Sequence, residues 1–148
     1  MPIPAEYRRA LPSGRACTMA VLRMVGLRPT RQRVALAELL FTGSHQHVTA
    51  EELHQRAQDI KVGISLATVY NTLNQFRQAG LLRDVTVDST ASYFDTDTSD
   101  HHHFFVEGEQ RVLDIPRSGI SIDGLPQPPL GMKITHVDVV VRVARVQA

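Results

Sequence analysis

The first half of the chain has the apolar spacing of helices, and the second half has the alternation of strands. Apolar residues recur every three or four positions in three segments: residues 30–41, 47–60 and 64–80. Each segment has a residue that commonly caps a helix N-terminus at or near its start: Thr30, Thr49 and Ser65. Glu52 completes a capping box with Thr49, and Gly43 and Gly80 favour helix ends. The pattern therefore predicts three well-bounded helices. A shorter helix is expected to begin near Thr18, after an N-terminal arm over residues 1–19.

The third predicted helix has two chemically different faces. Its apolar face consists of Leu66, Val69, Leu73 and Phe76. The opposite face presents Thr68, Asn71 and Gln75, which are small or amide side chains without a carboxylate. Such a face can approach phosphates and base edges without charge repulsion.

After residue 80 the period changes to that of β structure. Residues 81–87 and 91–96 are expected to pair through a turn at residues 88–90, and residues 101–108 and 111–116 through a turn at Glu109–Gln110. The alternation of residues 132–146 predicts one long strand with a valine-lined face. Between these strands, residues 118–132 are rich in proline and glycine and predict a loop.

This order of elements predicts an α+β chain, with a winged helix-turn-helix domain over residues 20–96 and a small, mostly β domain over residues 97–148. An ordinary small α+β domain is the alternative. About fifty residues are too few for a generous core, so the second domain is expected to form a homodimer through its sheet.

Charge is distributed unevenly along the chain. The net charge of +1 is the sum of +5 from residues 1–85 (11 Lys/Arg, 6 Asp/Glu) and −4 from residues 86–148 (5 Lys/Arg, 9 Asp/Glu). A basic first half favours a polyanion partner such as DNA. Cys17 is the single cysteine, which excludes an intrachain disulfide and a four-cysteine zinc site. With neither a secretion signal nor a long apolar run, the expected location is cytoplasmic, without a membrane partner.

Three consecutive histidines, His101, His102 and His103, lie among aspartates and glutamates in "TDTSDHHHFFVEGE". A metal site, a catalytic site, a cofactor ligand and a purification tag are the candidate explanations, and the internal position argues against a tag. Because side chains alternate along a strand, His101 and His103 should share one face and His102 the other. A solvated histidine-rich strand edge is the structural alternative.

Four segments carry a family resemblance: "GLRPTRQRVALAELL", "HVTAEELHQRA", "SLATVYNTLNQF" and "DHHHF". Together they resemble the ferric uptake regulator family over about residues 20–145, and "HHHFFVEGE", "RVLDIP" and "GLPQPPLGM" resemble its iron response regulator branch of α-proteobacteria. The resemblance implies a homodimeric transcription regulator that binds an A/T-rich palindromic operator in double-stranded DNA. It implies a DNA-facing role for Ser65, Thr68, Tyr70 and Asn71. It also implies that Arg28, Arg31 and Arg33 reach phosphates or the minor groove, against the alternative of a solvated helix start.

The resemblance also implies a regulatory metal site with ligands at His47, Asp95, His102 and Asp114. Phe104 stands where the family usually has a further histidine, which predicts weaker or differently selective binding. Two histidines and two carboxylates suit Fe²⁺, Mn²⁺ or Zn²⁺.

A second site would use His101 and His103, with His136 as a further ligand. The family's structural zinc is held by two CxxC pairs, which this chain lacks, so no cysteine-ligated structural zinc is expected.

In the iron response branch, a histidine triplet is associated with haem. The resemblance therefore implies regulatory haem binding at His101, His102 and His103, with a haem-handling protein as a candidate donor. Cys17 lacks the following proline of a Cys-Pro haem motif, and a plain surface or packed thiol is the simpler interpretation.

The branch resemblance implies DNA binding when iron is scarce, at operators of iron-dependent and haem-biosynthesis genes, and release from DNA when haem binds. Two other functions are alternatives. One is a metallo-hydrolase, for which no HExxH motif appears, and the other is a haem or metal buffer, in which Tyr70→Ala would change nothing measurable in the cell.

Overall fold

The computed structural model describes residues 14–88 and 92–147. The chain divides into two units, Met1–Thr98 and Ser99–Ala148, and each is described by itself. Most of the predicted N-terminal arm and the predicted turn at residues 88–90 lie outside the described residues. Among the residues described, no helix is long and apolar enough to cross a membrane.

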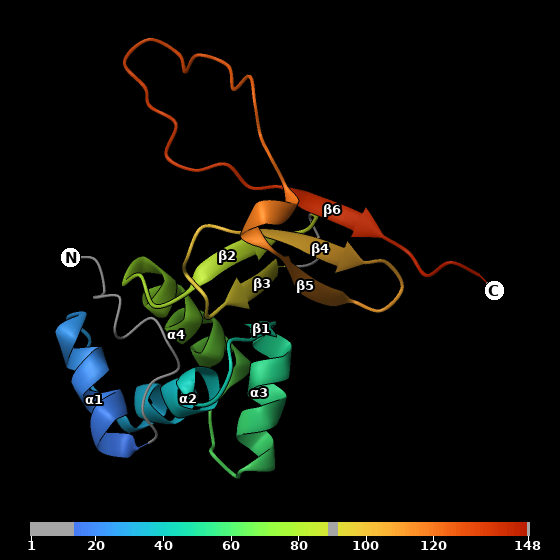
Figure 1. Cartoon of the computed structure of the whole chain (residues 1–148). Coiled ribbons are helices and arrows are strands. Elements are labelled where there is room, and N and C mark those ends of the chain that lie inside the picture. Colours follow the sequence, from blue (N-terminus) through green and yellow to red (C-terminus); the bar gives the residue numbers. More distant parts are fainter. Residues whose placement is uncertain (1–13, 89–91, 148) are drawn as a thin grey trace. The chain divides into compact units, whose positions relative to one another are not determined.

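Over residues 14–88 and 92–98, the first unit contains four helices and a small sheet (Figure 1). The helices are α1 (Arg15–Met24), α2 (Arg31–Phe41), α3 (Ala50–Asp59) and α4 (Leu66–Gln78). The strands are β1 (His47–Val48), β2 (Arg83–Thr86) and β3 (Ser92–Asp95), in the antiparallel order β1-β3-β2. Three predicted helices followed by a hairpin are therefore present, and α1 begins three residues before the predicted start at Thr18.

The three predicted N-caps form hydrogen bonds to the backbone at the starts of α2, α3 and α4. Thr30 Oγ1 accepts from the Arg33 amide at 3.2 Å, and Ser65 Oγ accepts from the Thr68 amide at 3.1 Å. Thr49 and Glu52 form the full capping box, with both hydrogen bonds at 3.1 Å. Gly80 follows α4 with φ +81°, a left-handed conformation that costs glycine little. The local sequence signals were thus sufficient to place these helix ends.

The core of the first unit lies between the helices. Its most deeply buried side chains, at 0% exposure, are Leu36, Leu40, Leu53, Ala57, Val69, Leu73 and Phe76. Three of the four predicted core positions of α4 are in this set, and Leu66 is partly buried against it. The core fixes which face of α4 points outward.

The second unit is a three-stranded sheet in the order β5-β4-β6 (Figure 1). Strands β4 (His102–Val106) and β5 (Arg111–Ile115) form the predicted antiparallel hairpin, and β6 (Val140–Val143) pairs with β4 in parallel. A short 3₁₀ helix, Arg117–Gly119, follows β5. Phe105, Val106, Val112 and Ile115 are buried on this small sheet.

The predicted long strand over residues 132–146 is wrong, because only Val140–Val143 is a strand. Val140 lies opposite His103, one residue after the start of β4. The residues before Val139 therefore have no residue of β4 opposite them. They form the loop that leaves the sheet in Figure 1. A strand needs a partner for its backbone groups, which alternation alone cannot supply. Met132 and Leu130, at 67% and 103% exposure, lie in this loop.

Candidate DNA-binding and metal-binding sites

Helices α3 and α4 form a helix-turn-helix, and α4 occupies the position of its second helix. Tyr70 and Asn71 are exposed on α4, and Thr68 and Gln75 are half-buried. No aspartate or glutamate interrupts the Leu66–Gln78 sequence. The second helix of this motif is the one that enters the major groove. Its surface can therefore approach DNA without a carboxylate of its own opposing the phosphates.

Tyr70 is held by a residue that the sequence did not single out. Its hydroxyl donates to Glu51 Oε1 at 2.6 Å, from α4 to the first turn of α3. This hydrogen bond is the main cause that raises the pKa of Tyr70 above its ordinary value. Sequence reasoning missed Glu51 because residues 51 and 70 meet through helix packing rather than through local spacing.

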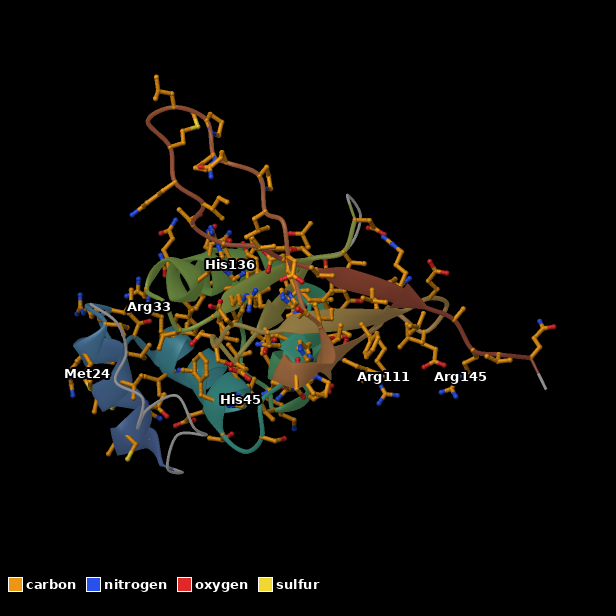
Figure 2. The ribbon with its side chains drawn as sticks, turned by 45° about the horizontal axis from the view of Figure 1, so that its top comes forward. Met24, Arg33, His45, Arg111, His136 and Arg145 are labelled. Carbon is orange, nitrogen blue, oxygen red and sulfur yellow. The ribbon has the colours of Figure 1, made fainter. Side chains whose placement is uncertain are left out.

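Arg33 makes contacts within the first unit, and its predicted phosphate contact stays a prediction. Its Nε and Nη2 donate to Gln75 Oε1 at 3.2 and 3.0 Å, and its Nη1 donates to the Arg28 carbonyl at 3.0 Å. Arg33 thus ties α2 to α4 (labelled in Figure 2), because the packing of these helices brings the guanidinium to Gln75. Arg28 and Arg31 are exposed, which suits the predicted phosphate contacts.

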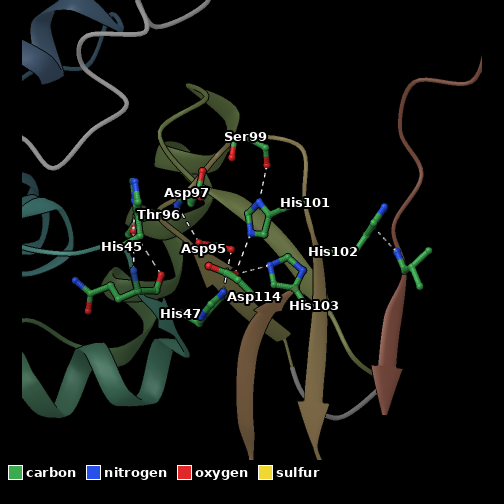
Figure 3. Close-up of polar contacts among 12 residues, drawn as sticks. His45, His47, Asp95, Thr96, Asp97, Ser99, His101, His102, His103 and Asp114 are labelled. Carbon is green, nitrogen blue, oxygen red and sulfur yellow. Dashed lines mark hydrogen bonds and ion pairs between the residues drawn. The ribbon is translucent and has the colours of Figure 1, made fainter. Parts of the chain in front are cut away.

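His101, His103 and Asp114 form a cluster within the second unit (Figure 3). His101 Nε2 and His103 Nε2 lie 3.1 and 3.5 Å from the same atom, Asp114 Oδ1. Both imidazoles are nearly inaccessible, at 4% and 2% side-chain exposure, whereas Asp114 is 45% exposed. The two rings are 4.4 Å apart, as strand alternation predicted for residues 101 and 103. The β4–β5 register places His103 opposite Asp114.

The hydrogen bonding of His101 prepares its Nε2 to bind a cation. His101 Nδ1 lies 2.7 Å from the Ser99 carbonyl, which can only accept, so Nδ1 carries the proton. In the neutral ring, Nε2 then directs a lone pair at the Asp114 carboxylate. A divalent cation placed between these two atoms would accept an electron pair from each. Metal-binding histidines commonly donate their other ring N–H to a backbone carbonyl in this way. The donor set therefore fits a metal ion.

The predicted pairing of His102 with Asp114 is wrong. His102 points to the other face, where its Nδ1 accepts from the Val139 amide at 3.1 Å. Asp114 is opposite His103 instead, because the hairpin turn sets the register of β5 against β4. The three histidines consequently do not present one common ligand face.

His136 pairs with two aspartates of the second unit. Its Nε2 lies 2.7 Å from Asp138 Oδ1, and its Nδ1 lies 3.5 Å from Asp100 Oδ1. A shallow cavity of about 260 Å³ is lined by Asp100, His101, His102, Ile122, Ile134, Thr135, His136 and Val137. His136 thus pairs with two aspartates and lines a cavity together with His101, and its predicted grouping with His101 and His103 stays a prediction.

His47 and Asp95 form a pair within the first unit (Figure 3). They are opposite one another on β1 and β3, and His47 Nε2 lies 3.0 Å from Asp95 Oδ2. The Asp95 side chain is completely buried, and its Oδ1 accepts from the Asp97 amide at 2.8 Å. Both residues were predicted metal ligands, and this pair offers one imidazole and one carboxylate.

A polar network joins the neighbours of this pair to α2 and α3. Gln46 precedes His47, and its Nε2 donates to the carbonyls of Leu39 and Leu40 at 3.0 and 2.7 Å. Arg56 of α3 donates to Gln46 Oε1 at 2.7 Å and to the Leu39 carbonyl at 2.8 Å. The Gln46 amide and carbonyl both pair with Thr96, which follows Asp95. The network satisfies carbonyls at the end of α2 that have no partner inside the helix.

Sequence reasoning missed this network because its members are spread over residues 39–96. The only local signal is that Gln46 and Thr96 are polar residues beside two candidate ligands. Cys17 is a half-buried free thiol on α1.

Comparison with known proteins points to one family. The sequence model described as "Ferric uptake regulator family" matches residues 24–141. The chain is 33% identical over 120 residues to the peroxide-responsive repressor PerR of Staphylococcus aureus (strain Mu50), which covers 80% of each chain. It is 34% identical over 119 residues to the peroxide operon regulator of Bacillus subtilis (strain 168), covering 80% of this chain and 81% of the relative.

Solved structures show the same fold. The ferric uptake regulator of Vibrio cholerae superposes with a TM-score of 0.67 at 24% identity, covering 86% of this chain and 98% of that one. The ferric uptake regulator of Pseudomonas aeruginosa, solved with manganese, gives a TM-score of 0.65 at 22% identity, covering 86% and 97%. These likenesses confirm the predicted α+β class, with its winged helix-turn-helix and small β domain.

Proposed function

The chain belongs to the ferric uptake regulator family, and from that premise we propose that it is a repressor whose DNA binding responds to a divalent cation held by His101, His103 and Asp114. Proteins of this family regulate transcription, bind DNA as dimers and are not enzymes. The observation that carries the cation proposal is the convergence of two buried imidazole nitrogens on one carboxylate oxygen.

Two histidines and one carboxylate suit Fe²⁺, Mn²⁺ or Zn²⁺. The Ser99 carbonyl supports this assignment, because it holds the His101 ring in the tautomer that leaves Nε2 as a donor to metal. His47 and Asp95 remain predicted ligands of a regulatory cation, and the metal affinity of a His47→Ala variant tests that prediction. His136 and His102 are not part of the proposed three-residue ligand set.

The DNA-binding surface of the proposed regulator is the exposed face of α4. Tyr70 and Asn71 are available for base edges or sugars, and Arg28 and Arg31 for phosphates. An A/T-rich palindromic operator remains the expected target, because a two-fold symmetric dimer presents two copies of α4 to two half-sites.

The experiment uses a duplex selected from a randomised library by the wild-type protein. Its affinity is measured in chelator, in Mn²⁺, in Zn²⁺ and, without oxygen, in Fe²⁺. We expect tighter binding with at least one of these metals. Asp114→Asn should weaken metal binding and remove that response, whereas Asp123→Asn, an exposed carboxylate in the loop, should change neither. Equal DNA affinity with chelator and with all three metals would refute the proposal.

A peroxide response is a second candidate, favoured by the names of the relatives from S. aureus and B. subtilis. The proposed ligand set also matches the two-histidine, one-carboxylate arrangement of non-haem iron sites that react with oxygen. We expect hydrogen peroxide to release operator DNA from protein loaded with Fe²⁺ but not from protein loaded with Mn²⁺. Release from both forms would point to another target of oxidation.

A haem response is the third candidate, and membership of the iron response regulator branch stays a prediction with it. In its favour, His102 lies beside an open cavity of about 260 Å³ and faces away from Asp114. The prediction is that haem releases operator DNA and that DNA binding is strongest when iron is scarce. A haem titration followed by the absorption spectrum, compared between wild type and His102→Ala, tests it. Identical spectra and unchanged operator affinity would exclude His102 as a haem ligand.

A further inference from the structure

The contact between Tyr70 and Glu51 is a side-chain link between the two helices of the helix-turn-helix. Tyr70 is 41% exposed on α4, so part of its side chain is accessible to a partner. Its hydroxyl reaches the carboxylate of Glu51 at 2.6 Å, within the range of strong hydrogen bonds to a charged acceptor. Glu51 lies in the first turn of α3, where a negative charge is favourable.

We propose that Glu51 is a positioning residue that sets the DNA sequence discrimination of α4 by fixing the Tyr70 ring. This inference rests on the proposed DNA-binding function. A tyrosine side chain has two rotatable bonds, and the hydrogen bond to Glu51 restricts both. The ring is then already placed when it meets a base edge or a thymine methyl group.

The expected change in sequence discrimination follows from the conformational entropy that the Tyr70 side chain would lose on binding DNA if Glu51 did not already restrict it. Immobilising one side chain costs about 0.5–1.5 kcal/mol, and 1.4 kcal/mol is a factor of ten in affinity. Removing the acceptor should therefore lower the preference for the selected duplex by about two- to tenfold. Contacts to phosphates do not depend on base identity, so binding to a scrambled duplex should not fall with it.

Charge has a separate effect on DNA affinity. Removing a carboxylate near DNA raises affinity for every sequence, because repulsion of phosphates does not depend on the base. Discrimination, the ratio of the affinities for selected and scrambled duplexes, cancels this effect. Glu51→Gln serves as the conservative variant, since its amide oxygen can still accept from the Tyr70 hydroxyl. Asp59→Asn is the matched charge control, because Asp59 lies at the other end of α3 and accepts from Gln55.

The experiment measures the affinity ratio for the wild type and five variants at one salt concentration and with the metal that supports binding. The variants are Glu51→Ala, Glu51→Gln, Asp59→Asn, Tyr70→Phe and the Glu51→Ala/Tyr70→Phe double variant. We expect Glu51→Ala and Tyr70→Phe to lower the ratio equally, and the double variant to lower it no further. Glu51→Gln and Asp59→Asn should keep the wild-type ratio.

A second measurement follows the contact without DNA. The Tyr70 ring resonance should titrate at higher pH in the wild type than in Glu51→Ala, since the hydrogen bond to Glu51 raises the pKa of Tyr70. A merely structural role of Glu51 would not produce matching losses in Tyr70→Phe.

Two outcomes separate the inference from its premise. A wild type that discriminates, together with a Glu51→Ala variant that discriminates equally well, refutes the role of Glu51 alone. Additive losses in the double variant refute it too. A wild-type protein that binds the selected and scrambled duplexes equally refutes both the proposed function and this inference.

Discussion

Arg56→Met tests the network that joins the His47–Asp95 neighbourhood to α2 and α3. The substitution keeps an unbranched apolar stem and removes two donated hydrogen bonds, to Gln46 Oε1 at 2.7 Å and to the Leu39 carbonyl at 2.8 Å. The Leu39 carbonyl keeps its bond from Gln46 Nε2, but Gln46 Oε1 loses the partner it has in Arg56.

Each hydrogen bond to a charged group contributes about 1.5–3 kcal/mol. Both bonds are partly buried, so the lower end of that range applies, and the free energy of unfolding should fall by about 3 kcal/mol. For a domain of this size the midpoint temperature should fall by roughly 12 °C or more. The loss of stability should be larger than for the substitution of an exposed arginine. The reason is that Gln46 Oε1 stays half-buried without its Arg56 donor, so its desolvation cost is no longer offset.

Urea unfolding of the full chain, followed by far-ultraviolet circular dichroism, measures this loss. In the part of the chain that the structure describes, the four α-helices lie in the first unit, so the helical signal reports on that unit. Arg23→Met, on the exposed last turn of α1, is the matched control and should cost only a few tenths of a kcal/mol. Arg56→Lys should fall between the two, since an ammonium keeps the charge but not the planar fork. A loss below about 1 kcal/mol for Arg56→Met, in the range of an exposed ion pair, would refute the role assigned to the network.

Three further predictions concern packing, capping and charge. Phe76→Ala, at a completely buried position of α4, should cost about 3–5 kcal/mol in urea unfolding, and a loss under about 1 kcal/mol would contradict the core assignment. Ser65→Ala should cost about 1 kcal/mol, measured in the same way, whereas an exposed Ser118→Ala should not. The hydrogen bond from Arg145 holds the pKa of Glu109 below its ordinary value. The stabilisation from the Glu109–Arg145 pair is therefore present above the ordinary pKa of glutamate, and it is lost as the pH falls through the lowered pKa of Glu109. In Glu109→Gln, the free energy of unfolding should therefore change less with pH at acidic pH than in the wild type. An unchanged pH dependence would contradict a stabilising Glu109–Arg145 pair.

Local sequence signals were enough wherever a structure depends on neighbouring residues. The capping box of Thr49 and Glu52, the N-cap of Ser65 and the buried face of α4 all follow from spacing within a few residues. The same holds for the shared orientation of His101 and His103, because alternation is a property of a single strand. These features can be predicted without knowing which residues of other elements they contact.

Features that depend on a partner from elsewhere in the chain were mispredicted or missed. The alternation of residues 132–146 suits a long strand, but β4 is short and offers pairing to only a few of them. The hydrogen bond from Arg33 to Gln75 was missed, because it depends on the packing of α2 on α4.

The sequence by itself therefore determined the order of the helices, the starts of α2, α3 and α4, the α+β class and the presence of ligands suited to a divalent cation. Tertiary structure decided which carboxylate meets which histidine. The register of β5 against β4 places Asp114 opposite His103 rather than beside His102. Helix packing decided that Glu51 holds Tyr70. The physical reason is common to both: periodicity fixes the direction of a side chain on its own element, and only packing fixes what that side chain meets.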